Sequence, residues 1–216
     1  MSTNSKLRLG NKGFTLVELM IATAVFGTVL LMVTMAVLQF TRVYYKGVTQ
    51  ANTQDTARAI IDRLSQGIQF NGGLVTATNA APSAGTPYAF CVGNQQYSYT
   101  TGTQLADSPI ASQTPHALVV DEAAGCNSST PAQNVRTAAV AGRELLAPKM
   151  RLARMKVEPV GVSPDPRVFK ISVKVVFGDD VLLSNPTAEN AACKTQQGSQ
   201  FCAVSDITTV VTKRVQ

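Results

Sequence analysis

Four cysteines, Cys91, Cys126, Cys193 and Cys202, carry the most reactive side chains of the sequence. An even number of thiols in an oxidising compartment predicts up to two disulfides, with three possible pairings. The segment between Cys193 and Cys202 is short and polar, so this loop closes easily, and we prefer the pairing Cys193–Cys202, which implies Cys91–Cys126. Zinc is the competing interpretation. Because no C-x-x-C occurs and His116 is the only histidine, no metal site is expected.

Other groups that could support chemistry do not form a catalytic pattern. Asp121 and Glu122 are adjacent, so on a strand their side chains point to opposite faces. His116 has no serine or cysteine elbow motif to work with, and no phosphate-binding glycine loop occurs. Four possible oxygen ligands follow a predicted strand: Asp179, Asp180, Asn185 and Glu189. Their spacing fits no recognised calcium loop, which favours a charged hairpin turn. The sequence therefore predicts neither an enzyme nor a cofactor.

The net charge of +6 is spread too thinly to predict nucleic-acid binding. The densest basic group after the N-terminus is Lys149, Arg151, Arg154 and Lys156. On a regular strand these side chains would be divided between the two faces. Nucleic acid is therefore not an expected partner.

Glu18 is the only charged residue among the 25 residues from Phe14 to Leu38. A helix of this length spans roughly 38 Å, which is enough to cross a bilayer. A carboxylate within such a helix costs about 2.5–3.5 kcal/mol, and less near the interface. One interpretation places Glu18 at headgroup depth. In the other, cleavage between Gly13 and Phe14 creates an α-amine, and Glu18 of one chain neutralises Phe14 of its neighbour. The spacing alone does not separate the two.

The first 13 residues contain three basic residues and no acid, which holds this end in the cytoplasm. A secretory signal peptide has an apolar region of roughly 7–15 residues followed by a small-residue cleavage site. Here the apolar run is longer, no convincing A-x-A follows it, and no lipoprotein cysteine ends it. We expect a leader at 1–13 and a membrane-spanning segment at 14–38.

The segment Gly13-Phe14-Thr15-Leu16-Val17-Glu18-Leu19 resembles the leader junction of type IV pilins and type II secretion pseudopilins. The resemblance covers roughly the first quarter of the chain. It implies that a prepilin peptidase cuts after Gly13 and methylates the new N-terminal residue, Phe14. It also implies that Glu18 guides docking into a filament of other pilin subunits.

The resemblance also bears on the class of subunit. Major pilins often carry a helix-kinking proline at the position of Met35, whereas here no proline occurs before Pro82. This difference and the chain length favour a minor pilin, and the region after the helix resembles minor pilins of the J or W type. The fold implied is the pilin fold.

A single helix over 14–70 is predicted to position these residues. No proline interrupts it, and Gly67 followed by Asn71-Gly72-Gly73 supplies its end. Its second half is amphipathic and is expected to pack on its own head through an apolar face. That face consists of Val48, Ala51, Ile60, Ile61, Leu64 and Ile68. The Tyr44-Tyr45 pair suits either a membrane-interface belt or packing on the head.

Residues 71–216 are predicted to form a β-rich exported head, so the fold class is α+β with an antiparallel meander. The expected strands are Tyr88–Val92 and Gln96–Thr100 around a Gly93-Asn94 turn, His116–Val120, Arg151–Val160, Val168–Phe177 and Ile207–Val215. In Val168–Phe177, the odd-numbered residues from Phe169 to Phe177 are expected to be buried, with Lys170, Ser172 and Lys174 in water. The loops at 79–87, 101–115 and 124–135 are expected to be exposed and to touch a target.

The sequence thus predicts a structural filament subunit. The basic leader fixes orientation, the Gly13–Phe14 bond is cut, and a platform protein of the assembly motor lifts the subunit from the cytoplasmic membrane as Glu18 docks. The head lies outside the cell and then on the pilus surface. A pilus, a secretion pseudopilus and a competence filament fit equally well. The rival interpretation is an extracellular binding domain on a single-pass anchor that is never cut.

Overall fold

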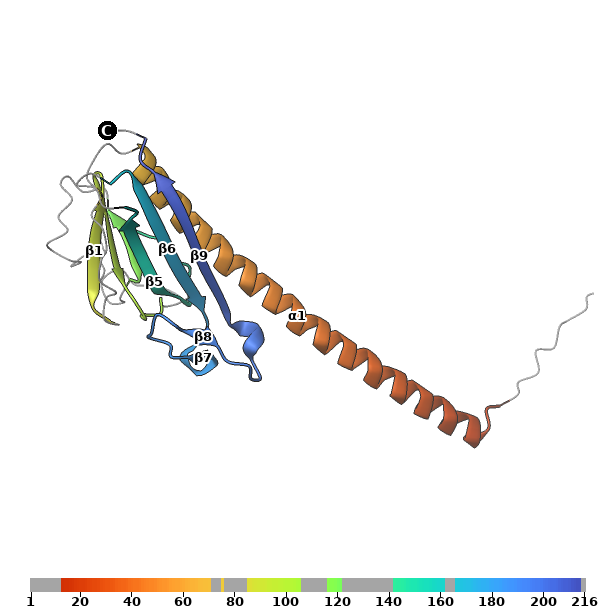
Figure 1. Cartoon of the computed structure of the whole chain (residues 1–216). Helices are drawn as coiled ribbons and strands as arrows, with labels where there is room; N and C mark the ends of the chain where they lie inside the picture. The colour runs from red at the N-terminus through yellow and green to blue at the C-terminus, as the bar shows by residue number, and fades with distance from the viewer. Residues whose placement is uncertain are drawn as a thin grey trace, which may run out of the picture. The chain divides into compact units, whose positions relative to one another are not determined.

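In the computed structural model, one helix of 55 residues, α1 (Leu16–Phe70), is followed by β-strands (Figure 1). The structure describes residues 13–70, 75, 85–105, 116–121, 142–161 and 166–214. The predicted single long helix is therefore present, and it passes through Gly27 and Met35 without a break. The chain divides into two units, Met1–Val43 and Tyr44–Gln216, which are described separately here.

In the first unit, the described side chains are exposed, with only Gly27 partly covered. Three threonine hydroxyls within the apolar stretch donate to carbonyl oxygens of the same helix. Thr23 donates to Met20 O at 3.0 Å. Thr28 and Thr34 each make such a bond at 2.8 Å, to Val25 O and Leu30 O. Their polar atoms are thus satisfied inside the helix. Among the described residues, α1 is the one helix long and apolar enough to cross a membrane.

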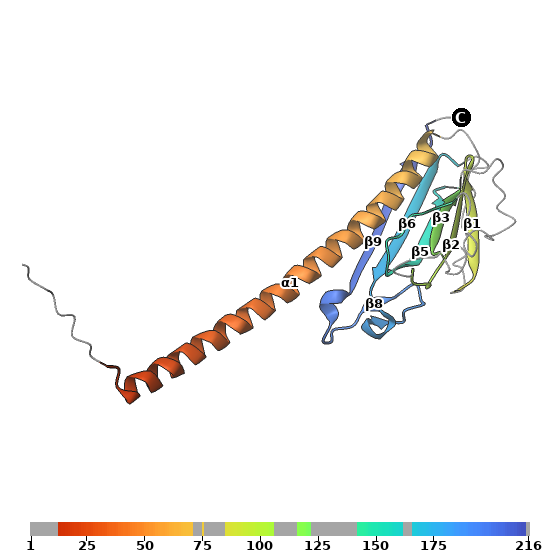
Figure 2. The same cartoon turned by 180° about the vertical axis from the view of Figure 1, so that it is seen from behind.

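The second unit contains three antiparallel sheets (Figure 2). The first has the order β1-β2-β3-β4, the second β5-β6-β9 and the third β7-β8. The strands are β1 (Pro87–Val92), β2 (Gln95–Thr100), β3 (Leu118–Asp121), β4 (Arg143–Glu144), β5 (Met150–Pro159), β6 (Val168–Phe177), β7 (Leu183–Ser184), β8 (Ala192–Cys193) and β9 (Ala203–Thr212). The α+β class is confirmed, but the strands form separate sheets instead of one meander.

Both predicted hairpins are present. β1 and β2 pair with Val92 opposite Gln95, so the turn between them has two residues. Gly93 has φ 60°, a conformation that glycine adopts without steric cost and that a tight hairpin turn requires. β5 and β6 pair from Met150↔Phe177 to Pro159↔Phe169. The last strand, β9, begins four residues before the predicted Ile207.

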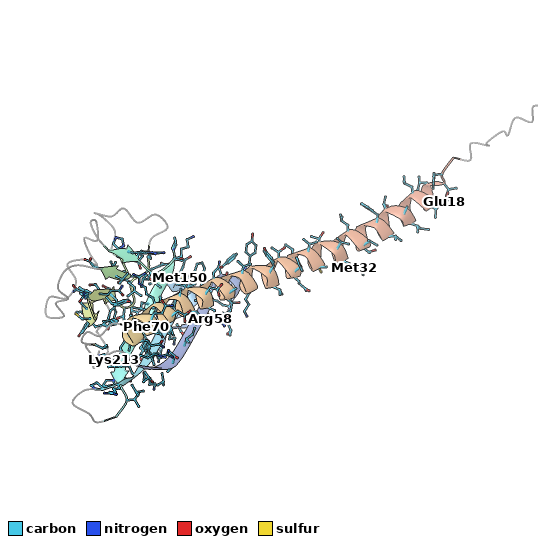
Figure 3. All side chains as sticks on the ribbon, turned by 90° about the horizontal axis from the view of Figure 1, so that it is seen from above. Glu18, Met32, Arg58, Phe70, Met150 and Lys213 are labelled. Atoms are coloured by element: carbon cyan, nitrogen blue, oxygen red, sulfur yellow. A yellow bond between two sulfur atoms is a disulfide. The ribbon has the colours of Figure 1, made fainter. Side chains whose placement is uncertain are left out.

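The main core of the second unit joins one face of α1 to sheets β1-β2-β3-β4 and β5-β6-β9. The buried residues of α1 are Thr53, Ala57, Ile60, Ile61, Leu64 and Ile68. The prediction that Val48 and Ala51 belong to this face is wrong, because both are exposed. Ala51 lies two residues from Thr53, which is about half a turn around the helix. Figure 3 shows the side chains along α1, with Arg58 and Phe70 labelled in its second half.

The predicted alternation along β6 holds on one face only, and on that face Phe177, which was expected to be buried, is partly exposed. Phe169, Ile171, Val173 and Val175 are buried as expected. The opposite face is not uniformly wet: Ser172 is buried and hydrogen-bonds with Thr208 (Oγ–Oγ1 3.1 Å), and Val176 is fully buried. A second apolar cluster covers Val176, formed by Ala153, Leu183, Ala191 and Cys202. Most of this cluster comes from residues after β6, with Ala153 contributed by β5, and strand alternation alone does not reveal it.

Candidate processing and assembly site

The bond between Gly13 and Phe14 lies just outside α1. Gly13, Phe14 and Thr15 precede the first helical residue, Leu16. The side chain of Phe14 is 87% exposed, and a methyl group in place of a Gly13 hydrogen would meet no atom within 4 Å. The junction is therefore exposed and outside regular secondary structure, as an endopeptidase needs for access.

Glu18 and Thr15 form a capping box at the start of α1. The Thr15 Oγ1 accepts a hydrogen bond from the Glu18 backbone N–H at 3.2 Å. In return, Glu18 Oε2 accepts from the Thr15 backbone N–H and from the Thr15 hydroxyl, both at 2.9 Å. These bonds satisfy N–H groups that have no partner within the helix, and the carboxylate lies at the positive end of the helix dipole.

The capping box gives Glu18 a role inside its own chain. The sequence carries the signal for it, because T-x-x-E before an apolar run is a capping-box pattern. The sequence suggested two interpretations of Glu18, headgroup depth and a neighbouring amine, and capping of its own helix was not among them. Neither is excluded by it, since the bonds to Thr15 hold the carboxylate at the exposed end of the helix.

The preferred cysteine pairing is the one that the structure contains. Cys193 and Cys202 are disulfide-bonded, with their Cα atoms 5.8 Å apart. Cys91, in β1, is also disulfide-bonded. Its expected partner, Cys126, lies outside the described residues, so that pairing stays a prediction.

The acidic group after β6 makes ion pairs with the basic residues of β5. Asp180 Oδ1 lies 2.5 Å from Nη1 of Arg151, which is 1% exposed. Arg151 also donates to the carbonyl oxygens of Gly178 and Pro186. Among the described residues, no group of three or more histidine, cysteine or acidic side chains is arranged to hold a metal ion. These acids thus fix the segment after β6 to the sheet.

The prediction that the basic residues of β5 are divided between two faces is wrong. A β-bulge between Leu152 and Arg154 shifts the register by one residue. Arg151, Arg154 and Lys156 consequently pair with Val176, Lys174 and Ser172, alternate residues of β6 on one face. They do not form a free basic patch, because Arg154 contacts Glu189 and Asp206 and Lys156 contacts Glu189.

Glu189 is the acid most affected by this cluster. Its carboxylate accepts a hydrogen bond from Lys156 Nζ at 3.0 Å and lies 3.4 Å from Arg154 Nη1. The hydrogen bond from Lys156, with the charges of Lys156 and Arg154, lowers the pKa of Glu189 below its ordinary value of 4.5. Partial burial opposes this shift. The side chain is ionised at neutral pH and acts as a bridge between two cations.

Glu144, which the sequence analysis did not single out, is a carboxylate with four contacts to other residues. It accepts hydrogen bonds from the backbone N–H groups of Ala117, Leu118 and Leu146, each at 3.0 Å. His116 Nδ1 lies 3.2 Å from Glu144 Oε2. The carboxylate ties β3 to the segment after β4. No local sequence signal marks it, because three of its four partners, His116, Ala117 and Leu118, are 26–28 residues away. His116 is thus placed beside a structural acid, and Asp121 lies buried in β3.

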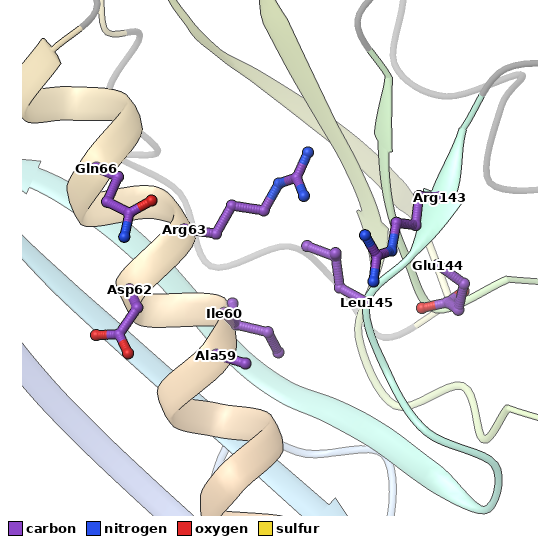
Figure 4. Close-up of a pocket in the computed structure, with 8 residues that line it drawn as sticks. All are labelled: Ala59, Ile60, Asp62, Arg63, Gln66, Arg143, Glu144 and Leu145. Atoms are coloured by element: carbon purple, nitrogen blue, oxygen red, sulfur yellow. The ribbon is translucent and has the colours of Figure 1, made fainter.

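A pocket of about 340 Å³ lies between the second half of α1 and β4 (Figure 4). Its lining is Ala59, Ile60, Asp62, Arg63, Gln66, Arg143, Glu144 and Leu145. Arg63 extends from α1 towards the side that carries Arg143. The carboxylate of Glu144 is already engaged by backbone N–H groups, so this lining offers no nucleophile with an adjacent base.

The N-terminal geometry agrees with what comparison with known proteins shows. Residues 8–34 match the family model of the prokaryotic N-terminal methylation motif. This motif, with its class III signal peptide, is typical of type IV pilins and pseudopilins, which are structural proteins. The chain therefore has a prepilin-type N-terminus. No curated protein and no solved structure matches the chain.

Proposed function

We propose that this chain is a structural subunit, of the minor pilin type, in a type IV pilus or a related filament. The observation that carries the proposal is the methylation motif at 8–34, which coincides with the exposed Gly13–Phe14 junction and the capped start of α1. The absence of a proline before Pro82 and the unbroken helix support the minor type.

The division of the chain follows from this function. Residues 1–13 are the leader, 14–38 the membrane-spanning and assembly segment, and 71–216 the exported head. A prepilin peptidase cuts after Gly13 and methylates Phe14. The mature subunit stays in the cytoplasmic membrane, head outwards, until a platform protein transfers it into a filament of other pilin subunits.

Glu18 has two successive roles in this mechanism. In the membrane its carboxylate caps its own helix through Thr15. Cleavage creates an α-amine on Phe14, and during assembly the carboxylate of one subunit pairs with the amine of its neighbour. The pairing lowers the cost of a charge within an apolar bundle, which for an unpaired carboxylate is about 2.5–3.5 kcal/mol.

The first experiment is mass spectrometry of the mature chain recovered from membranes. We expect a chain that begins at Phe14 with an N-methyl group. A chain that keeps residues 1–13 would contradict the proposal and favour the uncleaved, membrane-anchored binding domain.

A second experiment separates the two roles of Glu18. In Glu18→Gln the side-chain carbonyl still accepts the Thr15 N–H, as glutamine does in capping boxes, but the charge is gone. In Glu18→Ala both the hydrogen-bond acceptor and the charge are lost. We expect both variants to be cleaved and neither to enter filaments. If Glu18→Gln assembles as well as the wild type, charge pairing is not the basis of docking.

A further inference from the structure

One edge of the sheet β5-β6-β9 has no neighbouring strand in the described part of the chain. The strand order places β9 at the border of this sheet, paired with β6 on one side only (Figure 1). The pairing runs from Val168↔Thr212 to Phe177↔Ala203 without a register shift. We call the side of β9 that faces away from β6 the open edge. An open strand edge is a template for pairing with another chain.

A hydrogen bond just after β9 shows which backbone groups lie on the open edge. The Lys213 N–H donates to the Arg167 carbonyl oxygen at 2.7 Å, in register with the pairs of β9 and β6. The odd-numbered residues of β9 therefore bond to β6. In an antiparallel ladder, the even-numbered residues then direct their N–H and C=O groups away from β6.

Among the described residues, hydrogen bonds from α1 reach the open edge only at its two ends. Gln50 Nε2 donates to the Val204 carbonyl oxygen at 3.1 Å, and the Arg214 N–H donates to the Gln69 carbonyl oxygen at 3.1 Å. Between these contacts lie residues 206–212, about 23 Å of strand. Their even-numbered members are exposed, and no described residue bonds to their outward backbone groups.

The sequence of this stretch favours strand pairing and lacks the usual protection of an edge. Residues 207–212 read Ile-Thr-Thr-Val-Val-Thr, a run of β-branched side chains, the type most favoured in strands. Exposed edges are commonly protected by proline, by lysine or by a β-bulge. None of these occurs between Asp206 and Thr212, and Val210 is 60% exposed. The open edge therefore favours pairing with a strand of a partner.

Two lysines beside the open edge indicate the charge of the partner strand. Lys170 and Lys174 of β6 lie opposite Val210 and Asp206 of β9. In the described part of the chain, neither lysine makes an ion pair or a side-chain hydrogen bond. A carboxylate on an added strand beside Thr208 would lie level with the midpoint between the two lysines, about 10 Å from the β6 backbone. Because Thr208 is short, both lysine side chains can extend towards it.

The nearby acids do not neutralise these lysines. Asp206 and Glu189 are both paired with Arg154. Glu158 lies opposite Lys170 on β5, but the two side chains form no ion pair. An acidic partner strand would therefore supply the missing counter-charge.

We propose that the open edge of β9 binds an extended acidic segment of a partner protein as an added strand. Outward backbone groups of residues 206–212 hydrogen-bond to the segment, and Lys170 and Lys174 pair with its carboxylate beside Thr208. The inference goes beyond the proposed function. It uses contacts within the second unit only and does not depend on cleavage after Gly13.

The probe is a dye-labelled peptide, Thr-Val-Thr-Glu-Thr-Val-Thr, and its binding to the full chain in detergent micelles is followed by fluorescence anisotropy. In Val210→Pro the open edge loses one outward N–H, whereas the ladder to β6 is kept because the Val210 N–H faces away from β6. Val210→Ala is the matched control, since it shortens the side chain and keeps the N–H. We expect Val210→Pro to bind about tenfold more weakly and Val210→Ala to stay within about threefold of the wild type.

Two further peptides test the same contacts on the unchanged protein. A peptide N-methylated at every residue after the first has no backbone N–H to donate at those residues, so it should not bind. A peptide with lysine in place of glutamate should bind the wild type several-fold more weakly than the glutamate peptide does. The double variant Lys170→Gln/Lys174→Gln should bind the glutamate and lysine peptides equally.

Three outcomes would overturn the inference. The first is no binding of the glutamate peptide at about 1 mM. The second is binding of the N-methylated peptide as tight as that of the parent peptide, because the backbone of β9 would then not be the docking surface. The third is equal binding of the glutamate and lysine peptides to the wild type, because the partner segment would then not be acidic. None of these results bears on cleavage after Gly13, which mass spectrometry of the mature chain tests separately.

Discussion

At the scale of single residues, Thr15 and Glu18 show how a charge is accommodated at the edge of an apolar segment. The carboxylate accepts two hydrogen bonds from Thr15, and the Thr15 hydroxyl accepts one from the Glu18 backbone. The two side chains therefore each accept one backbone N–H at the start of the helix that has no partner within it. Its local role and its proposed role in docking use the same side chain at different stages.

Removal of the Thr15 hydroxyl tests the local role. Thr15→Val should weaken the start of α1 by about 1 kcal/mol, which corresponds to about fivefold faster hydrogen exchange at the Glu18 amide. Thr15→Ser keeps the hydroxyl and should exchange like the wild type. The measurement is amide hydrogen exchange of the full chain in detergent micelles. Equal exchange in both variants would mean that the hydroxyl does not cap the helix.

Glu144 gives a second prediction at this scale. Glu144→Gln places an amide NH₂ opposite one or more backbone N–H donors, so buried donors lose their acceptor. We expect the free energy of unfolding to fall by about 1–3 kcal/mol. The matched control is Glu158→Gln on β5, a surface change expected to stay within about 0.5 kcal/mol. Denaturant unfolding followed by circular dichroism provides the comparison. A Glu144→Gln chain as stable as the control would contradict the role assigned to Glu144.

At the scale of elements, the bulge in β5 decides what the basic residues do. One extra residue between Leu152 and Arg154 brings three cations to the same face. That face then meets the acidic segment after β6 and the acid of β9. A bulge cannot be predicted from the alternation of apolar and polar residues along a strand, because the extra residue shifts that alternation by one position. The cations therefore form ion pairs within the chain.

The pKa of Glu189 predicts how this ion-pair cluster responds to acid. Since the pKa is lowered in the folded state, the contribution of Glu189 to stability is present above pH 4.5 and is lost as the pH falls through the folded-state pKa. The side chain is 39% exposed, so solvent screening limits the contribution to below about 1 kcal/mol. Glu189→Gln should thus be less stable than the wild type at pH 7 and equally stable once the wild-type carboxylate is protonated.

Thermal unfolding of both chains from pH 7 down to pH 3 measures this difference. Lys156→Met serves as the background for a double-mutant cycle, because it removes the cation that lowers the pKa most. In that background the effect of Glu189→Gln at pH 7 should shrink. If the difference in melting temperature between the wild type and Glu189→Gln stayed constant with pH, Glu189 would not have the lowered pKa assigned to it.

At the scale of the whole molecule, the Cys193–Cys202 disulfide stabilises a part of the head with a small apolar cluster of its own. Replacing both cysteines by serine should lower the free energy of unfolding by roughly 2–3 kcal/mol in the chain-entropy model. It should also increase hydrogen exchange in η2 more than in β6. The measurement is denaturant unfolding of the full chain with exchange read by segment. Unchanged stability would show that the cluster of Val176, Leu183 and Cys202 holds the loop without the bond.

Much of the architecture follows from sequence patterns that act locally. The apolar stretch, the missing prolines and the Gly93-Asn94 turn predicted the helix and the first hairpin. Features that depend on distant segments were not predictable in this way. The phase of the buried face of α1 was wrong at Val48 and Ala51, because the head, rather than helix composition alone, selects which residues are covered.

The candidate site shows the same contrast. Gly13, Phe14 and Glu18 stand out because a lone acid in an apolar run is rare. The T-x-x-E pattern was available at the same place but was not used. Glu144 could not be found from sequence, since two of its three backbone donors, Ala117 and Leu118, come from a distant segment of the chain. Roles in processing and docking for the N-terminal residues stay predictions.

The threonine hydroxyls of the apolar stretch have one further consequence. Thr23, Thr28 and Thr34 each donate to a carbonyl oxygen three or four residues earlier in the same helix. Exchanging acyl chains for neighbouring helices therefore requires none of these hydroxyls to find a new acceptor. The three hydroxyls keep the same acceptors in lipid and among neighbouring helices. They therefore add no free-energy cost to moving the stretch in either direction between the two environments.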